Sequence, residues 1–331
     1  MRITETSYTV ESETLESVFT TWQQTDGYLP WNCIFVLPVW LKTWWRSFGG
    51  ADTPYLFAVR QADRTIGVAP LQRNGDTVRL IGDENVCDYL DFIVAPEAAA
   101  PFYRILLKSL KQDGVSRLDL ALVRQDSSVM TQLLPVAEKA GCTVTYENGD
   151  ISYELPLPVS WESYLSSLSG KERHEVRRKL RRLHEAGRIN YRLVDDSYGI
   201  NEEMQTFLTL FRSNRSDKAE FMNDHMVAFF KELAESLVEF GMLKLFFLDL
   251  DERPVAGILC IDYLSTMYLY NNGYDERFKS LSVGLLGKLL SIRDSIRSGM
   301  RAYDFLKGAE AYKRRLGGQP VQLYRCLIEL T

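Results

Sequence analysis

The chain has 331 residues, of which 46% are hydrophobic, 25% charged and 12% aromatic, a composition typical of folded globular proteins rather than of disordered or fibrous ones. Its length exceeds one typical domain of roughly 150 residues, so one large domain or two ordinary ones are expected. The net charge of −5 argues against an overall basic nucleic-acid-binding module, so any anion site must be local.

The 5 cysteines are scattered without a CxxC pair, which argues against a disulfide framework or a zinc ribbon and indicates buried thiols in a reducing compartment. The first residues lack a basic stretch followed by an apolar one, and the longest apolar runs are shorter than the roughly 18 residues of a membrane span. We therefore expect a cytoplasmic protein without a transmembrane segment.

The apolar spacing and turn residues of the first half predict two helices, four strands, a helix, a strand, a further helix and two closing strands. In chain order these are residues 15–22, 39–48, 55–60, 66–73, 78–82, 89–94, 98–111, 117–122, 129–140, 142–147 and 151–155.

The second half repeats this order more clearly. It predicts strand 189–194, helices 201–211 and 223–240, strands 243–249, 255–262 and 265–271, helix 282–299, strand 301–306, the short helix 309–315 and strand 321–330. Ser282 is expected to cap its helix and Gly299 to end it.

The repeated order predicts an α/β fold with mixed (α+β) sheets in two domains, although no short residue-level repeat is present. Pro156 and Pro158 interrupt an apolar segment at the junction. We place the domains at residues 1–155 and 156–331, with the last strand, 320–331, able to pack back on the first domain.

A basic helix opens the second half. Ser169 and Glu172 form a capping box, Gly187 ends the helix, and lysines and arginines cover most of its surface. This surface suits either a solvated face or a phosphate-rich ligand. His174 and His184 have no companions at metal-ligand spacing, so no metal is predicted.

Two later segments could carry chemistry. Loop 278–287 enters a helix, so its unpaired N–H groups can form an anion site or serve only as ordinary helix caps. The segment 304–318 (DFLKGAEAYKRRLGG) places Asp304 nine residues before Lys313, which fits either an ion pair or a reactive site.

The motifs at residues 268–278 (YLYNNGYDERF), 281–290 (LSVGLLGKLL), 304–308 (DFLKG), 312–317 (YKRRLG) and 171–187 stand in an order that resembles the GNAT fold in its tandem, FemAB-like form. The likeness is closest to the CelD/BcsL (BioF2-like) acetyltransferases. Residues 38–49, 67–71 and 88–92 have counterparts in the first half, so the resemblance covers nearly the whole chain.

The resemblance implies two tandem GNAT-like domains, with acetyl-CoA as a co-substrate between strands 265–271 and 301–306 of the second. Lys279, Ser282 and Gly284 stand where ordinary GNAT enzymes carry [QR]-x-x-G-x-[GA]. The implied donor site comprises Asn271, Lys279, Leu281, Ser282, Val283, Gly284 and Leu285. The first domain would be the acceptor side, with a degenerate donor site.

In such a fold an acceptor amine or hydroxyl attacks the thioester directly. Tyr312 would protonate the departing thiolate, and Lys313 or a backbone N–H near Asn271 would face the oxyanion. Asp304 is the first candidate for the general base and Glu310 the second. Acceptor-binding residues are expected between the halves, at Lys42, Asp88, Asp91, Arg212 and Arg215.

The function implied first is acyl transfer from acyl-CoA to an amine or hydroxyl of a sugar or cell-envelope polysaccharide precursor. One alternative is a FemAB-type aminoacyltransferase that uses aminoacyl-tRNA to modify peptidoglycan, which the basic helix suits and the net acidity does not. The other is a non-catalytic GNAT-derived scaffold in polysaccharide synthesis. Fold likeness alone does not choose among them.

Overall fold

The computed structural model describes residues 8–24, 27–214 and 220–330. Their contacts divide the chain into two compact units. Unit 1 comprises the residues up to Ile151 together with those from Val321, and unit 2 comprises Ser152–Pro320. Strands β7 (Thr143–Pro156) and β13 (Gln319–Glu329) each cross from one unit to the other.

Unit 1 is built on a mixed sheet with the strand order β1-β2-β3-β4-β6-β13-β7. Only the contact between β4 and β6 is parallel among the pairs described in this sheet. The strands are β1 (Tyr8–Glu13), β2 (Thr53–Gln61), β3 (Arg64–Asn74), β4 (Thr77–Leu80), β6 (Arg117–Arg124), and the short β5 (Ile93–Val94), which pairs with β3 off the main path.

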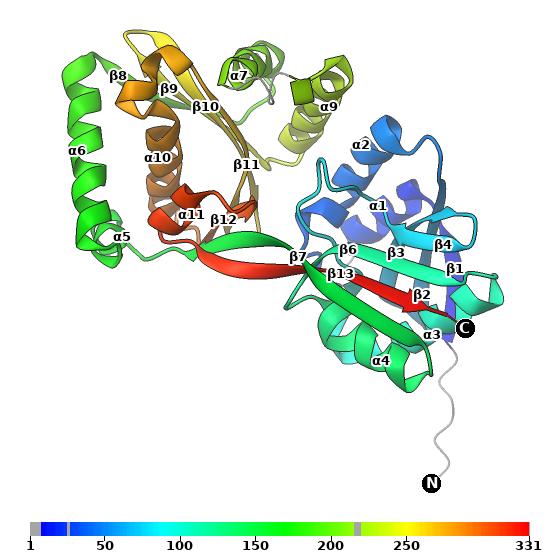
Figure 1. Cartoon of the computed structure of the whole chain (residues 1–331). Helices are drawn as coiled ribbons and strands as arrows, with labels where there is room; N and C mark the ends of the chain where they lie inside the picture. Colours follow the sequence, from blue (N-terminus) through cyan, green and yellow to red (C-terminus); the bar gives the residue numbers. More distant parts are fainter. Residues whose placement is uncertain (1–7, 25–26, 215–219, 331) are drawn as a thin grey trace. The chain divides into compact units, whose positions relative to one another are not determined.

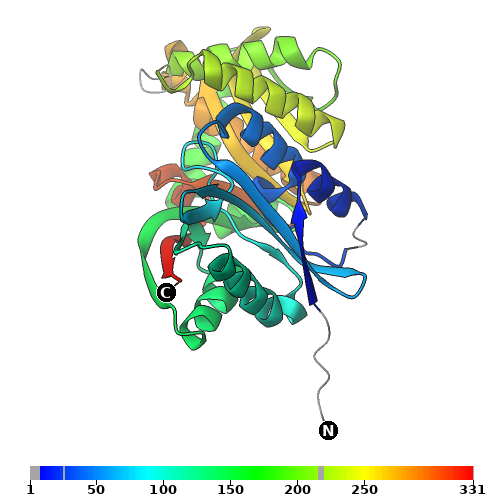
Figure 2. The ribbon, with the colours of Figure 1, turned by 90° about the vertical axis from the view of Figure 1, so that its right-hand side faces the viewer.

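Helices cover both faces of this sheet, α1 and α2 on one side and α3 and α4 on the other (Figures 1 and 2). Phe102, Leu106 and Leu110 of α3 recur every four residues and are buried because this stripe faces the sheet. The helices are α1 (Leu15–Gln24), α2 (Pro38–Phe48), α3 (Ala99–Gln112) and α4 (Leu134–Lys139), with short turns η1 (Ile34–Val36), η2 (Pro96–Ala98) and η3 (Val129–Leu133).

Unit 2 has the strand order β7-β12-β11-β10-β9-β8. Again one pair, β11 with β12, is parallel, and the other described pairs are antiparallel. The strands are β8 (Ile189–Val194), β9 (Leu243–Leu250), β10 (Arg253–Tyr263), β11 (Thr266–Tyr274) and β12 (Ala302–Lys307).

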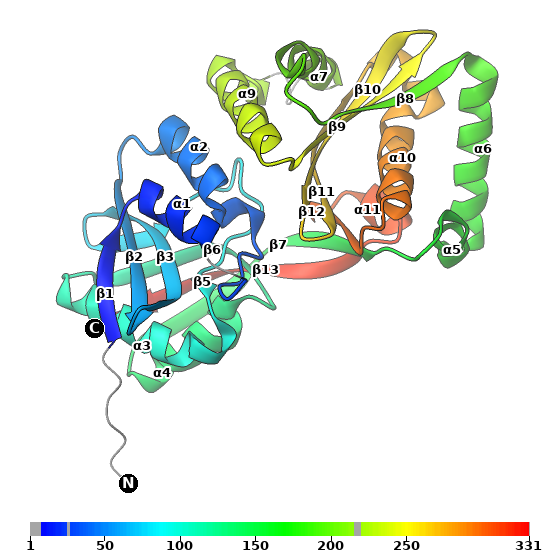
Figure 3. The ribbon, with the colours of Figure 1, turned by 180° about the vertical axis from the view of Figure 1, so that it is seen from behind.

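In unit 2, α7 and α9 lie on one face of the sheet and α10 lies on the other, where α6 contacts it (Figures 1 and 3). Asn223 caps α9 by accepting a hydrogen bond from the Met226 amide at 3.0 Å. The helices are α5 (Trp161–Ser167), α6 (Gly170–Ala186), α7 (Ile200–Asn214), α9 (Asp224–Glu239), α10 (Val283–Arg297) and α11 (Ala311–Arg315), with the 3-10 turn η4 (Glu276–Leu281) before α10. No helix in the described part of the chain is long and apolar enough to cross a membrane.

The repeated order of elements is confirmed, and three details differ from the prediction. Strand β1 was not expected because its side chains are mostly exposed at the sheet edge, where no apolar alternation is required. The two strands predicted at 142–147 and 151–155 form one strand, β7, which begins at Thr143. The strand predicted at 89–94 is only Ile93–Val94, because Asp91 just before it instead accepts hydrogen bonds from the Ser128 amide and hydroxyl, at 2.8 and 2.7 Å.

Candidate functional site

The site of interest in unit 2 begins where β11 and β12 part. They pair in parallel only from Thr266 to Tyr268 against Ala302 to Asp304, although β11 continues to Tyr274 and β12 to Lys307. Neighbouring strands that stop sharing hydrogen bonds leave backbone groups available to a ligand. In the chain, the unpaired end of β11 leads into α10 through a short turn, and the unpaired end of β12 leads into α11.

A β-bulge interrupts β11 at this point. Leu259 of β10 pairs with Asn271, while the next residue, Cys260, pairs with Leu269, so Tyr270 is the extra residue. A bulge re-aims the neighbouring backbone and side chains, and bulges are common beside active sites. The expected backbone donor near Asn271 therefore lies next to an irregular stretch of the strand.

Asp304 lies in β12, at the last residue that pairs with β11. It is fully buried, and its Oδ1 accepts hydrogen bonds from the Leu306 amide at 2.7 Å and from the Ser152 hydroxyl at 3.5 Å. Leu306 has a φ of 60°, a left-handed conformation unusual for leucine, beside a register shift between β12 and β7. The Asp304 carboxylate thus holds the backbone of this second bulge.

Lys313 of α11 holds in place the backbone at the end of β12. Its side chain is 2% exposed, and its ammonium group donates to the backbone oxygens of Leu306, at 3.1 Å, and Lys307. The ammonium also lies 3.0 Å from a carboxylate oxygen of Glu310, whose side chain is 58% exposed. Burial pushes the pKa of Glu310 upward, but the charge and hydrogen bond of Lys313 outweigh it, so the net pKa lies below the usual value.

A second buried lysine, Lys288, stands in the middle of α10. Its side chain is buried, its ammonium group donates to Asn272 Oδ1 at 2.8 Å, and it lies 4.6 Å from the ring centroid of Tyr312. An ammonium group over the face of an aromatic ring is attracted by the ring electrons. Helix α10, strand β11 and helix α11 therefore meet through these three side chains.

Tyr312 is the phenol of this group. Burial and the nearby Glu310 carboxylate raise its pKa well above the ordinary value. Its ring also meets Phe305 of β12 edge to face, with centroids 6.3 Å apart. A phenol with such a pKa stays protonated at neutral pH, so Tyr312 cannot act as a base there.

The start of α10 carries the predicted anion loop. Ser282 stands at the N-cap with a φ of 59°, but its side chain makes no capping hydrogen bond. The prediction of a side-chain cap is therefore wrong: the Ser282 hydroxyl instead accepts from the Lys179 ammonium at 2.6 Å. A Cβ at Gly284 would lie 2.5 Å from the Tyr274 ring, so only glycine fits there without a shift. The remaining predicted loop residues lie here too: Lys279 and Leu281 in η4 and Val283 and Leu285 in the first turn of α10.

The predicted acceptor residues are divided between the units. In unit 1, Lys42 of α2 pairs with Glu16 at 3.4 Å, Asp88 is half-buried, and Asp91 binds the chain at Ser128. In unit 2, Arg212 of α7 donates to the backbone oxygen of Met222 at 2.9 and 2.6 Å. Arg215 lies outside the described residues.

Sequence reasoning missed Lys179, Lys288 and Asn272. A signal for Lys288 was present, because a lysine four residues from both Gly284 and Ile292 shares the buried face of an otherwise apolar helix. Lys179 was visible only as one basic residue among several, because nothing local indicates that it reaches α10. Among the described residues no cluster of His, Cys, Asp and Glu could hold a metal ion.

Unit 1 also contains two parallel strands that part, but a different group binds the backbone at that point. Strands β4 and β6 pair in parallel only at Thr77 and Val78, and Leu122 of β6 has a φ of 58°, as Leu306 has in β12. The Leu122 oxygen accepts from the backbone amide of Leu90 at 2.9 Å, whereas the Leu306 oxygen accepts from Lys313. The chain around Leu90 thus occupies in unit 1 the position that a lysine takes in unit 2.

Residues 170–314 match the family of acetyltransferase (GNAT) domains. Among solved structures, the chain resembles FemX with 14% identity, a TM-score of 0.66 and 96% of each chain covered. It also resembles a tandem GNAT protein of the clavulanic acid biosynthesis pathway, with 12% identity, a TM-score of 0.51, and 98% of this chain and 99% of that chain covered. The chain has a tandem GNAT fold.

A third likeness of the chain is to the C-terminal domain of a putative lysylphosphatidylglycerol synthetase from Agrobacterium fabrum, with 10% identity, a TM-score of 0.54, and 88% and 87% coverage of the two chains. No curated protein matches the sequence. The matched GNAT region contains β11, α10 and β12 and reaches into α11 as far as Arg314. The match supports an acyltransferase, and the parting strands, the bulge and the anion loop all lie inside it.

Proposed function

We propose that this tandem GNAT protein transfers an acyl group from acyl-CoA to an amine or hydroxyl of a sugar or cell-envelope polysaccharide precursor, as a cytoplasmic member of the CelD/BcsL group. The observation that carries the proposal is the parting of β11 and β12 beside a bulge, within the matched acetyltransferase region. The GNAT fold usually uses acetyl-CoA, so we take acetyl-CoA as the first donor to test.

The donor phosphates would lie at the anion loop before α10. The N–H groups of the first helical turn lack partners within the helix and carry the positive end of its dipole. Lys179 brings an ammonium group to Ser282, and Lys279 stands in the preceding turn. These groups supply local positive charge in a chain that is acidic overall.

The chemical step forms one bond and breaks another. The acceptor nitrogen or oxygen attacks the thioester carbonyl carbon, the C–S bond breaks, and the Tyr312 phenol protonates the departing thiolate. Lys313, which is held by the backbone of residues 306–307, or a backbone N–H beside the bulge at Tyr270 would stabilise the oxyanion. The proton lost by the acceptor passes to a carboxylate or to water held by one.

Of the two candidate bases, the contacts favour Glu310 over Asp304. Asp304 is buried and binds the Leu306 amide, an arrangement that positions the strand. Glu310 is more than half exposed, and its lowered pKa keeps it ionised at neutral pH. We therefore assign Glu310 as the base and Asp304 as a positioning residue. In unit 1, Lys42 and Asp88 stay predicted acceptor residues, whereas the Asp91 carboxylate holds the chain at Ser128.

The surface of α6 favours one alternative, an aminoacyl donor esterified to tRNA. Four of its basic side chains are exposed: Lys171, Arg177, Arg181 and Arg182. Such a row can attract a nucleic-acid backbone, with an affinity that falls steeply as salt rises. The pairs of Arg178 and Lys179 with Glu175 reduce the net charge of the same helix.

A thermal-shift titration of the full chain separates these functions. A ligand at 100 times its Kd stabilises the folded state by about 2.7 kcal/mol. We expect a rise in Tm with acetyl-CoA, and thiol release when aminosugars or hydroxylated glycans are supplied as acceptors. A rise only with tRNA, lost at high salt, would support the aminoacyl alternative. No rise with either ligand would support a non-catalytic scaffold.

A further inference from the structure

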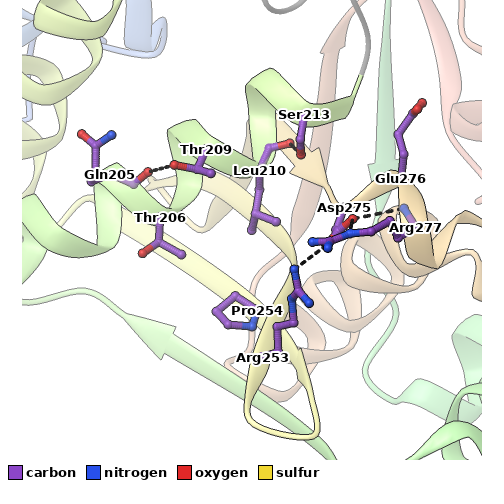
Figure 4. A pocket seen from close by; sticks show the side chains of 10 residues that line it. All are labelled: Gln205, Thr206, Thr209, Leu210, Ser213, Arg253, Pro254, Asp275, Glu276 and Arg277. Carbon is purple, nitrogen blue, oxygen red and sulfur yellow. Dashed lines mark hydrogen bonds and ion pairs between the residues drawn. The ribbon is translucent and has the colours of Figure 1, made fainter.

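Unit 2 contains a pocket of about 600 Å³ that the proposed transfer does not use. Figure 4 shows its walls: α7 on one side, and on the other the first residues of β10 together with the residues that follow β11. The pocket is set apart from Lys288, Tyr312 and Lys313, none of which lines it.

The α7 wall is polar. Gln205, Thr206, Thr209 and Ser213 line it, with Leu210 between them. The Thr206 and Thr209 hydroxyls donate to the backbone oxygens of Glu202 and Gln205, at 3.2 and 2.9 Å. Each hydroxyl donates its only hydrogen to the helix backbone, but its oxygen can still accept a hydrogen bond. This wall therefore suits a ligand that has hydroxyl donors.

The opposite wall is an arginine pair around one carboxylate. Asp275 accepts from Arg277 Nε at 2.9 Å and Nη2 at 2.6 Å, and Arg253 Nη2 lies 3.4 Å away on the same carboxylate. The Arg253 and Arg277 side chains are 51% and 67% exposed, whereas that of Asp275 is 10% exposed. These contacts use one edge of each guanidinium group, which leaves Nη1 of both for another acceptor.

Two arginines and two acidic residues line this wall, and their charged groups are not all paired with one another. Both guanidinium groups share the buried Asp275 carboxylate, whereas Figure 4 shows the Glu276 side chain pointing away from the Arg253 guanidinium. Guanidinium groups recognise phosphate with two parallel hydrogen bonds. The hydroxyl acceptors of α7 stand across the pocket from this charge.

We propose that this pocket binds a phosphate group carried by a hydroxylated ligand, such as a sugar phosphate or a nucleotide. Arg253 and Arg277 hold the phosphate, and Thr206 and Thr209 accept from the hydroxyls of the sugar. The pocket is a second anion site, distinct from the start of α10, and its occupancy does not require that the chain transfers an acyl group.

Calorimetric titration of the full chain tests this with two probes, glucose 1-phosphate and adenosine 3′,5′-bisphosphate, and with their phosphate-free analogues. At least one phosphorylated probe should bind while its analogue does not. The double variant Arg253→Gln/Arg277→Gln should weaken that binding at least tenfold, because charge-assisted hydrogen bonds contribute roughly 1.5–3 kcal/mol each. Glucose 1-phosphate binding points to a sugar phosphate, and bisphosphate binding that acetyl-CoA does not displace points to a separate nucleotide. Displacement of the bisphosphate by acetyl-CoA would overturn the proposal of a second anion site.

Two controls keep the result specific. The variant Arg104→Gln/Arg301→Gln removes the same charge from exposed positions outside the pocket and should leave binding within twofold. Thr209→Leu removes a hydroxyl acceptor from the opposite wall and leaves the arginine pair intact, so it should also weaken binding. The proposal is overturned if neither probe binds, or if binding survives in the Arg253→Gln/Arg277→Gln variant, or if the control variant loses as much.

Discussion

At the residue scale, burial decides which protonation states the groups of unit 2 can use. Tyr312 is held between Phe305 and Lys288, and its raised pKa keeps the phenol neutral across the usual assay range. Glu310, with a lowered pKa, is ionised over that range. A carboxylate base and a phenol acid can therefore coexist a few residues apart without exchanging roles.

We predict that Tyr312→Phe lowers kcat by about 10²-fold, because removing a positioned proton donor typically costs this much. Donor KM should change little, since the ring contacts remain. The matched control is Tyr198→Phe, at a residue that is 92% exposed. Thiol release from acetyl-CoA measures both. Wild-type kcat in Tyr312→Phe would remove the assigned role.

Lys288→Met is expected to separate stability from activity. The substitution removes an ammonium group from a site only 6% exposed, and it thereby removes the cost of burying that charge, which offsets the lost hydrogen bond to Asn272. Asn272 and Tyr312 would lose the ammonium that joins them, so kcat should fall at least about tenfold. Lys108→Met, at an exposed position of α3, is the control. A large fall in Tm, or unchanged turnover, contradicts this prediction.

At the element scale, one glycine sets how closely α7 approaches β11. A Cβ at Gly273 would lie 2.3 Å from the Phe211 amide nitrogen and 2.5 Å from its Cα, both backbone atoms of the helix. The helix can yield only by moving as a whole, because its backbone has no rotamer to change. Packing of α7 on the strand next to the bulge therefore depends on this position.

We predict that Gly273→Ala destabilises the protein by about 1–3 kcal/mol, the usual cost of overpacking a core. The Tm should drop by roughly 2–4 °C for each kcal/mol in a domain of this size. Gly170→Ala adds the same methyl group where no atom lies within 4 Å, so it should leave Tm unchanged or slightly raised. Scanning calorimetry of both variants is the measurement, and equal Tm values would contradict the close approach.

Elements with strong local signals could be predicted from the sequence, and those set by tertiary contacts could not. The N-cap of α6 is Ser169 as expected, and its hydroxyl accepts from the Glu172 amide at 3.2 Å. The strand at 89–94 failed because the hydrogen bonds of Asp91 are made with residues far along the chain. Ser282 failed as a cap because Lys179, 103 residues away in sequence, binds its hydroxyl.

The candidate site in unit 2 shows the same difference between local sequence signals and tertiary contacts. The segments that build it, around the bulge, the anion loop and α11, carry motifs that stand out in sequence. The contacts that define roles do not, since Lys288 meets Asn272 and Tyr312 only after three elements pack. The roles assigned to Asp304, Tyr312, Lys313 and Glu310 stay predictions.

At the scale of the whole molecule, the two units share an order of elements but differ in the group that binds one backbone carbonyl oxygen. In both, a leucine with positive φ lies in the strand after the sheet-covering helix, at Leu122 and Leu306. In unit 1 the leucine carbonyl oxygen accepts a hydrogen bond from a backbone amide, and in unit 2 it accepts one from a lysine side chain. Only the second arrangement brings an ammonium group to the end of the parted strand.

We therefore predict that the full chain binds one acetyl-CoA, in unit 2. Ser282→Asp should weaken this binding at least roughly tenfold, because aspartate tolerates the left-handed backbone there and places a negative charge against the donor phosphates. Ala100→Asp adds the same charge to the first turn of α3 in unit 1, at an exposed position, and should leave the affinity within twofold. Calorimetric titration gives both the number of sites and the affinity. Two sites per chain, or a loss in Ala100→Asp equal to that in Ser282→Asp, would show that unit 1 also takes up the donor.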